Sequence, residues 1–94
     1  MAWHLYIIRT TDQKLYAGVT TDVERRFKEH LSQGRRTARY LRAHKPESLV
    51  FSQLIGDRSL ALKVEHWFKR LPRKRKESIV QGGRLVVGAK GETP

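Results

Sequence analysis

Two tyrosines, an arginine, a histidine and a glutamate are the residues of this chain whose types and spacing could do chemistry. Tyr6 and Tyr16 stand ten residues apart. Arg26 follows ten residues after the second tyrosine, and His30 follows four residues after that. A single glutamate, Glu65, lies much further along the chain. Phenols, a guanidinium, an imidazole and a carboxylate together can supply what the hydrolysis of a phosphodiester requires.

That reaction needs an attacking water, a group that takes the proton of the water, and positive charge near the phosphate oxygens. A single carboxylate such as Glu65 can hold one Mg²⁺ ion, which keeps most of its waters and meets oxygens of the substrate. The positively charged guanidinium of Arg26 would bind the negatively charged phosphate. A phenol is a weak base at its ordinary pKa of about 10, and nearby positive charge would lower that pKa.

Taken one at a time, these residues also have purely structural explanations. Two tyrosines in a hairpin usually pack across strands, Arg26 could be a solvated helix charge, and His30 could lie at the edge of the core. Glu65 stands four residues before Lys69, and an exposed helical ion pair of this kind contributes only about 0.3–0.5 kcal/mol. The joint arrangement of the five residues is what favours the catalytic interpretation.

The first twenty residues predict a β-hairpin that places both tyrosines on one face of a sheet. Two stretches rich in β-branched and aromatic residues are separated by a polar turn. A loop of three residues would pair Tyr6 with Gly18 and Ile8 with Tyr16. Because side chains alternate along a strand, the tyrosines would then share a face, whereas an even loop without a bulge would separate them.

Helix caps and apolar spacing predict the remaining elements. The capping-box spacing of Thr21 and Glu24 predicts a helix to about Leu31. Its apolar stripe contains His30, and Arg26 lies at the edge of that stripe. The further elements expected are a short helix within 35–44, a strand at 48–55, a helix at 58–70 capped by Asp57, and a helix at 72–81.

This order of elements predicts an α+β domain with a small three-stranded antiparallel sheet flanked by helices. We expect the domain to span residues 1–81, with a loosely ordered C-terminal tail at 82–94. A chain of 94 residues has room for one domain only.

The charge balance points to a polyanionic partner. The chain has 20 Lys and Arg against 9 Asp and Glu, a formal net charge of +11. Such a surface attracts nucleic acid through the release of counterions, largely without regard to sequence. The predicted contacts with the DNA backbone form two groups: Arg35, Arg36, Arg39 and Arg42 in the first, and Lys69, Arg73, Lys74 and Arg75 in the second.

The sequence lacks the residue patterns that are typical of several other function classes. The chain has no cysteine, which excludes disulfides, thiolate metal sites and cysteine nucleophiles. Its four histidines show none of the close pairing that zinc sites favour. No stretch approaches the ~20 apolar residues of a membrane span, and no signal peptide is recognisable. The sequence therefore predicts a cytoplasmic protein without membrane attachment.

With these residues in view, the chain resembles the GIY-YIG nuclease family over about residues 3–81, in particular its small stand-alone bacterial members. The matching residues occur in the order of the family: Tyr6, Tyr16, Gly18, Arg26, His30 and Glu65. The chain departs from the family in one respect, because many members carry a late asparagine near the phosphate and this sequence contains no asparagine.

The resemblance implies a role for each catalytic residue. Glu65 would hold one Mg²⁺ or Mn²⁺ ion, and Arg26 would stabilise the charge that develops on the phosphate. Tyr6 would act as the general base or relay a proton to it, and His30 would tune a tyrosine. Tyr16 would position the phosphate or the water.

Two further residues of the second motif region receive roles from the same resemblance. Gly18 would let a phosphate or a helix approach the backbone, and Thr20 would hydrogen-bond within the site. The sequence thus predicts a metal-dependent DNA endonuclease, acting in DNA repair or on unusual DNA structures, with RNA as the alternative substrate. A protein partner would supply its specificity. The competing interpretations are a non-catalytic nucleic-acid-binding module and an interaction subunit that keeps the nuclease fold.

Overall fold

The computed structural model describes residues 2–85 and confirms the predicted α+β class. Its sheet is three-stranded and antiparallel, in the order β2-β1-β3. The elements in chain order are β1 (Trp3–Thr10), β2 (Leu15–Thr20), α1 (Val23–Leu31), α2 (Arg39–Ala43), β3 (Pro46–Gly56), α3 (Arg58–Lys69) and α4 (Arg73–Gly82).

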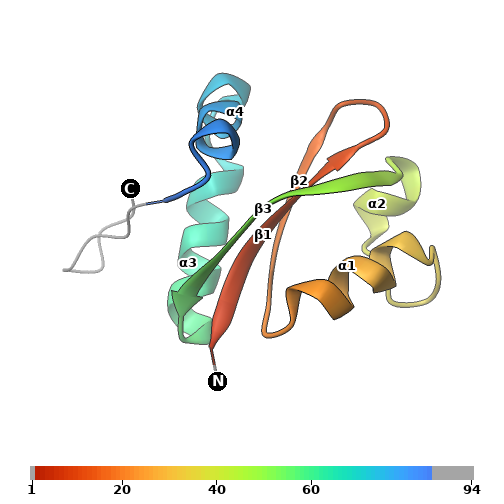
Figure 1. The fold of residues 1–94 in the computed structure, drawn as a ribbon, viewed down its shortest axis with the longest axis horizontal. Coiled ribbons are helices and arrows are strands. Elements are labelled where there is room, and N and C mark those ends of the chain that lie inside the picture. The colour runs from red at the N-terminus through yellow and green to blue at the C-terminus, as the bar shows by residue number, and fades with distance from the viewer. Residues whose placement is uncertain (1, 86–94) are drawn as a thin grey trace.

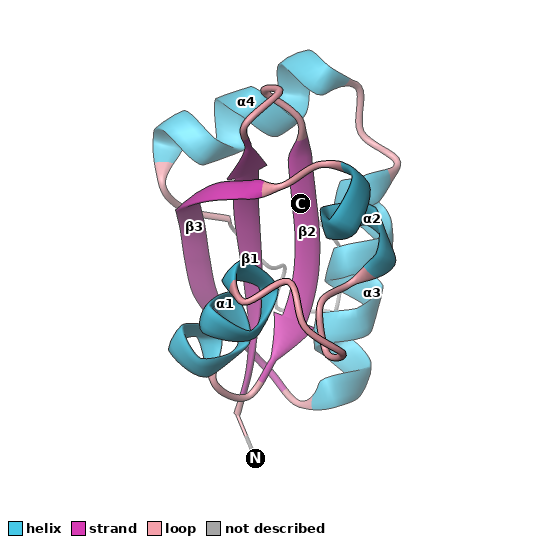
Figure 2. Cartoon of the chain, turned by 90° about the vertical axis from the view of Figure 1, so that its right-hand side faces the viewer, coloured by secondary structure: helices cyan, strands magenta, loops and turns pink. Residues whose placement is uncertain are grey.

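Helices cover both faces of the sheet (Figure 1). In Figure 2, α1 and α2 lie in front of the strands, while α3 runs behind them along the β2 edge and α4 crosses the end of the sheet. Alternation along β1 explains the two layers. Leu5 and Ile7 join the core that contains Val64 of α3, whereas Ile8 joins the second core with Leu41 of α2.

The hairpin has the predicted three-residue loop. The amide of Thr10 donates to the carbonyl of Lys14 over 2.9 Å, and Gln13 takes a positive φ of 66° to close the turn. Tyr6 pairs with Gly18 and Ile8 pairs with Tyr16, as predicted. Both tyrosines consequently lie on the face that α1 and α2 cover.

One predicted cap is wrong by a residue and another is confirmed. Asp22, not Thr21, caps α1, because its carboxylate accepts a hydrogen bond from the amide of Arg25 over 3.1 Å. Asp57 caps α3 as expected, and its carboxylate accepts from the amide of Leu60 over 2.8 Å. Both aspartates satisfy an amide that the first helical turn would otherwise leave without a partner.

The chain beyond α4 packs back onto the sheet as far as it is described. Leu85 is buried in the core, and the side-chain amide of Gln53 on β3 both donates to its carbonyl (2.9 Å) and accepts from its amide (2.7 Å). The expected domain boundary at residue 81 stays a prediction, and most of the expected tail, residues 86–94, lies outside the described residues. Within residues 2–85, no helix has both the length and the apolar character needed to cross a membrane.

Candidate active site

Tyr6 and Tyr16 form the centre of the candidate site. Their ring centroids are 6.3 Å apart. Tyr6 is only 1% exposed, so its phenol has almost no access to solvent. Tyr16 is partly exposed and lines a surface pocket together with Tyr40 of α2, Lys69 of α3 and Lys76 of α4. Of the two phenols, Tyr16 is therefore the one that a substrate can touch.

Gly18 makes room for the buried phenol. A Cβ atom built on Gly18 would lie 2.4 Å from the hydroxyl oxygen of Tyr6 and 2.6 Å from the ring carbon that carries it. Such distances are far below a carbon–oxygen or carbon–carbon contact. The group that lies against the backbone at Gly18 is the Tyr6 ring of the protein itself, and the approach of a phosphate or a helix stays a prediction.

We expect Gly18→Ala to displace the Tyr6 phenol and destabilise the fold by about 1–3 kcal/mol, because an added methyl group in a packed core forces its neighbours to shift. Urea unfolding measures the change. Gly82→Ala is the matched control, since nothing lies within 4 Å of a Cβ built there. Equal stability of Gly18→Ala and wild type would show that Tyr6 can move without cost.

His30 of α1 contacts the hydroxyl group of Tyr6. The Nε2 atom lies 2.9 Å from the Tyr6 oxygen, and the imidazole is fully buried. The backbone amide of Ala38 donates to Nδ1 over 3.2 Å. An Nδ1 that accepts carries no proton, so the neutral ring holds its proton on Nε2 and donates it to Tyr6. The Tyr6 hydroxyl proton is then free to point elsewhere.

The buried pair is uncharged at neutral pH. Burial lowers the pKa of His30 to about 4; Arg26 also lowers it, and Glu29 works against the shift. Burial raises the pKa of Tyr6 well above its ordinary value, Tyr16 adds to that rise, and Arg26 partly offsets it. The expectation that positive charge lowers the pKa of the phenol is therefore not met for Tyr6 in the protein alone, because burial outweighs the guanidinium.

Because the pKa of His30 falls from 6.5 to about 4 on folding, the unfolded chain binds a proton between these values and the folded chain does not. Stability therefore decreases as the pH falls through this window. We expect a loss of about 2 kcal/mol between pH 7 and pH 4.5 from this group. Urea unfolding at both pH values measures it.

His30→Gln should flatten this pH dependence, whereas His66→Gln, which removes an exposed histidine, should keep it. Lowered carboxyl pKa values do not interfere. The neighbouring Arg9 and Arg73 lower the pKa of Glu77 to about 2, and the stability that this carboxylate contributes is lost only below its ordinary value of 4.5. A wild-type slope in His30→Gln would assign the effect to another group.

Arg26 lies on the same helix as His30, and its charge partly offsets the rise in the pKa of Tyr6. Its Nη1 atom donates to Glu29 over 3.0 Å and to the carbonyl of Arg36 over 2.7 Å. These contacts use one end of the guanidinium, and the Arg26 side chain as a whole is about a quarter exposed. Arg25, the adjacent residue, points outward and is about half exposed. The helix therefore leaves Arg26 less exposed than Arg25, which lies on its solvent side.

Glu65 comes to the site from α3, at the edge of the sheet formed by β2. Its side chain is 17% exposed, and its Oε2 atom lies 3.2 Å from the ammonium of Lys69. The same ammonium lies 5.7 Å from the centre of the Tyr16 ring. Glu65 is thus linked to Tyr16 through a single side chain, that of Lys69. The ion pair between Glu65 and Lys69, which the purely structural explanation of Glu65 predicts, is also present.

The residues around Glu65 fit a divalent ion held by one carboxylate. Within residues 2–85, no three His, Cys, Asp or Glu side chains gather in a way that could enclose a metal. Mg²⁺ needs no such cage, because it keeps several waters and binds through one or two carboxylates together with substrate phosphates. Glu65 is accessible enough for that mode of binding, provided that Lys69 gives way.

Thr20 plays a different part from the expected one. It is buried, and its hydroxyl accepts from the amide of Asp22 over 3.2 Å and donates to the carbonyl of the same residue over 3.4 Å. These bonds fix the junction between β2 and α1. Thr20 therefore positions the helix that carries Arg26 and His30, and its hydroxyl is occupied by this local turn.

The eight predicted backbone-contacting basic residues are all exposed, but besides Lys69, which pairs with Glu65, two of them have structural partners. Arg73 binds Glu77 at 2.9 Å and the carbonyl of Gln13, which fastens α4 to the hairpin turn. Arg42 donates to the carbonyl of Gly34 over 2.8 Å. The other six present their charges to solvent or, in the case of Lys69, to the candidate site: Arg35, Arg36, Arg39, Lys69, Lys74 and Arg75.

Sequence reasoning missed an aromatic row beside Tyr16. The Tyr16 ring stacks on Tyr40 at 6.0 Å, and Tyr40 stacks on His44 at 4.5 Å. The Nδ1 atom of His44 lies 2.6 Å from the carboxylate of Asp12 in the hairpin turn. The available signal was the single aromatic residue in an otherwise basic helix. The row ties α2 to the hairpin and fixes one wall of the pocket.

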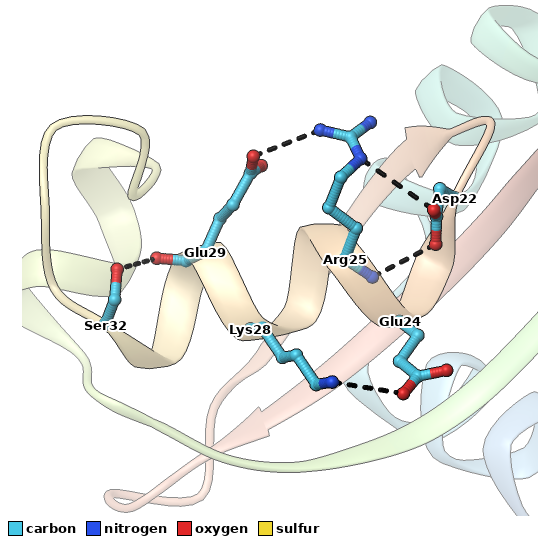
Figure 3. A pocket seen from close by; sticks show the side chains of 6 residues that line it. All are labelled: Asp22, Glu24, Arg25, Lys28, Glu29 and Ser32. Atoms are coloured by element: carbon cyan, nitrogen blue, oxygen red, sulfur yellow. Dashed lines mark hydrogen bonds and ion pairs between the residues drawn. The ribbon is translucent and has the colours of Figure 1, made fainter.

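The hollow over α1 does not offer a comparable site. It is lined by Asp22, Glu24, Arg25, Lys28, Glu29 and Ser32 (Figure 3). These side chains satisfy one another through ion pairs and hydrogen bonds along the outer surface of the helix. No phenol or buried imidazole points into it. The region around Tyr16 is therefore the candidate site.

Comparison with known proteins identifies the family of the chain. The sequence profile of the GIY-YIG catalytic domain matches residues 2–78. The chain is 51% identical over 81 residues to the UPF0213 protein YhbQ of Escherichia coli K12, covering 86% of this chain and 79% of that protein. A YhbQ of Escherichia coli O1:K1 / APEC is 49% identical over 85 residues, covering 90% and 83% respectively.

A solved structure leads to the same family. The solution NMR structure of the UPF0213 protein BH0048 from Bacillus halodurans matches with a TM-score of 0.55 and 36% sequence identity, covering 86% of this chain and 84% of that one. The chain belongs to the GIY-YIG family, which confirms the resemblance noted in the sequence. Membership supports a nuclease-type activity with nucleic acid as the substrate.

Proposed function

We propose that the protein is a divalent-metal-dependent endonuclease that hydrolyses phosphodiester bonds of DNA, in repair or in the processing of unusual DNA structures. The observation that carries this proposal is the buried hydrogen bond between Tyr6 and His30, directly beside the accessible Tyr16. A surface that only binds nucleic acid needs positive charge. It does not need a fully buried imidazole fixed in one tautomer against a buried phenol.

The proposed roles follow from access and charge. Tyr16 faces the pocket and would orient the attacking water, while the buried Tyr6 would support it through their shared contact. The Nε2–H of His30 donates to the Tyr6 oxygen and would stabilise a Tyr6 phenolate, which would accept the proton of the attacking water. Arg26 would stabilise negative charge on the phosphate as the water oxygen bonds to phosphorus and the leaving oxygen departs.

Glu65 would hold the one Mg²⁺ or Mn²⁺ ion. A bound divalent ion supplies positive charge to the phosphate oxygens and lowers the pKa of a coordinated water. The exposed basic residues away from the pocket, Lys74 and Arg75 among them, would hold the DNA backbone and set affinity without selecting a sequence.

The direct test is incubation of the purified chain with plasmid, branched and single-stranded DNA and with RNA, in Mg²⁺, Mn²⁺ or EDTA. We expect cleavage with either metal and none in EDTA. Binding of all substrates without cleavage under any condition would overturn the proposal and favour the non-catalytic binding module. A preference for RNA would keep the chemistry and correct the substrate.

A further inference from the structure

Lys69 of α3 lies between the carboxylate of Glu65 and the ring of Tyr16 in the candidate site. Its ammonium lies 3.2 Å from the carboxylate of Glu65 and 5.7 Å from the centre of the Tyr16 ring. It also lines the pocket into which Tyr16 faces. No other lysine or arginine within residues 2–85 forms an ion pair with Glu65. One flexible cation is therefore shared between the carboxylate and the accessible phenol.

An ammonium and a divalent ion compete for a carboxylate held in this way. A cation bound to Glu65 would repel the Lys69 ammonium and take over the oxygen that it contacts. The Lys69 side chain is half exposed and carries its ammonium on a flexible chain of four carbons. The ammonium can therefore leave Glu65 at little cost in free energy. The Lys69 ammonium would then be available to bind an anion in the pocket that this side chain already lines.

We propose that Lys69 couples the two ligands of the site: it neutralises Glu65 in the metal-free protein, and when a divalent cation binds it moves to a phosphate of the substrate. This inference rests on the proposed function, because it takes Glu65 as the metal ligand. It adds a positioning residue and a means of regulation. Metal binding raises the affinity for nucleic acid by freeing a cation, and nucleic acid raises the affinity for metal by the same factor.

The chain offers a closely matched control in Lys28. It also pairs with a glutamate four residues earlier, Glu24, and the distance between nitrogen and oxygen is again 3.2 Å. That pair lies on the outer face of α1 (Figure 3), in a hollow that no tyrosine lines. Lys28→Met therefore removes the same charge and the same kind of ion pair at a site without the proposed function.

Lys76→Met serves as a second control, for local charge. Lys76 lines the same pocket as Lys69, but within residues 2–85 it pairs with no carboxylate. If the effect of Lys69 came only from positive charge near the site, both variants would behave alike. Lys69→Arg completes the set, because it keeps a cation next to Glu65.

The first measurement is Mn²⁺ binding by the protein without nucleic acid, followed by electron paramagnetic resonance of the free ion. We expect Lys69→Met to tighten binding by about two- to fivefold, the factor that corresponds to removal of one partly exposed ion pair. Lys69→Arg and Lys28→Met should bind as wild type does, and Lys76→Met should change less than Lys69→Met. An unchanged affinity in Lys69→Met would overturn the proposal.

The second measurement is binding of a fluorescent DNA duplex in Ca²⁺ and in EDTA. Wild type should bind DNA more tightly with Ca²⁺, and Lys69→Met should lose about two- to fivefold of that gain. An equal gain in both proteins would also overturn the coupling. Glu65→Gln separates the two hypotheses: if it binds Mn²⁺ as tightly as wild type, the metal assignment in the proposed function fails, whereas failure of the Lys69 variants alone leaves that assignment intact.

Discussion

Glu65→Gln is expected to abolish metal-dependent cleavage while the fold and the binding of DNA persist. The substitution keeps the shape of the side chain and its ability to contact Lys69, but it removes the charge that a divalent ion requires. We expect kcat/KM in Mg²⁺ to fall on the order of a thousandfold or more, because metal binding stabilises the transition state by several kcal/mol. DNA binding in EDTA, measured by fluorescence anisotropy, should be unchanged or slightly tighter.

Glu24→Gln is the control for this experiment. Glu24 makes the same helical ion pair with a lysine four residues later, on the outer surface of α1. The control should cleave DNA at the wild-type rate. If Glu65→Gln and wild type show the same residual nicking, the activity comes from a contaminant, and the protein is a binding module with the fold of a nuclease.

The placement of the two tyrosines could be predicted because it depends on local rules. Strand periodicity is two, so the length of one turn decides whether Tyr6 and Tyr16 share a face. The register in the structure is the one that a three-residue turn produces. Arg26 and His30 are likewise placed by the period of a single helix: His30 contacts the hydroxyl of Tyr6, and the charge of Arg26 lowers the pKa of the same phenol.

The properties that decide the chemistry depend on contacts distant in the sequence, and spacing does not encode them. The tautomer of His30 is set by the amide of Ala38, in the loop that leads to α2. The burial of Tyr6 results from α1 and α2 closing over the sheet, and this burial reverses the expected direction of its pKa. Local pattern therefore locates the phenol and the imidazole, whereas tertiary packing determines their protonation.

The basic residues show the same division between what local sequence predicts and what long-range contacts determine. Composition predicts a cationic surface, and the eight residues assigned to it are exposed. Which of them are available to DNA depends on long-range partners. Arg73 pairs with Glu77, which in turn binds Arg9 of β1 at 2.7 Å. This network joins α4 to the sheet, so neutralising Arg73 would loosen the fold as well as remove a charge.

Arg26→Ala is expected to slow cleavage by about a hundred- to a thousandfold, with a smaller effect on DNA binding. The guanidinium stabilises charge that grows on the phosphate as the reaction proceeds, and removal of one such donor from an active site has effects of this size. The expected signature is a loss in kcat that exceeds the rise in KM. Steady-state kinetics on a short labelled duplex in Mg²⁺ measure both.

Arg25→Ala provides the comparison, because the adjacent arginine has the same charge and lies on the solvent side of the same helix. It should alter kcat by less than about twofold and weaken DNA binding no more than any surface charge does. Arg26 also holds the carbonyl of Arg36, so thermal unfolding of each variant must accompany the kinetics. Equal losses of kcat in the two well-folded variants would mean that the helix contributes only net charge, and the catalytic role of Arg26 would be wrong.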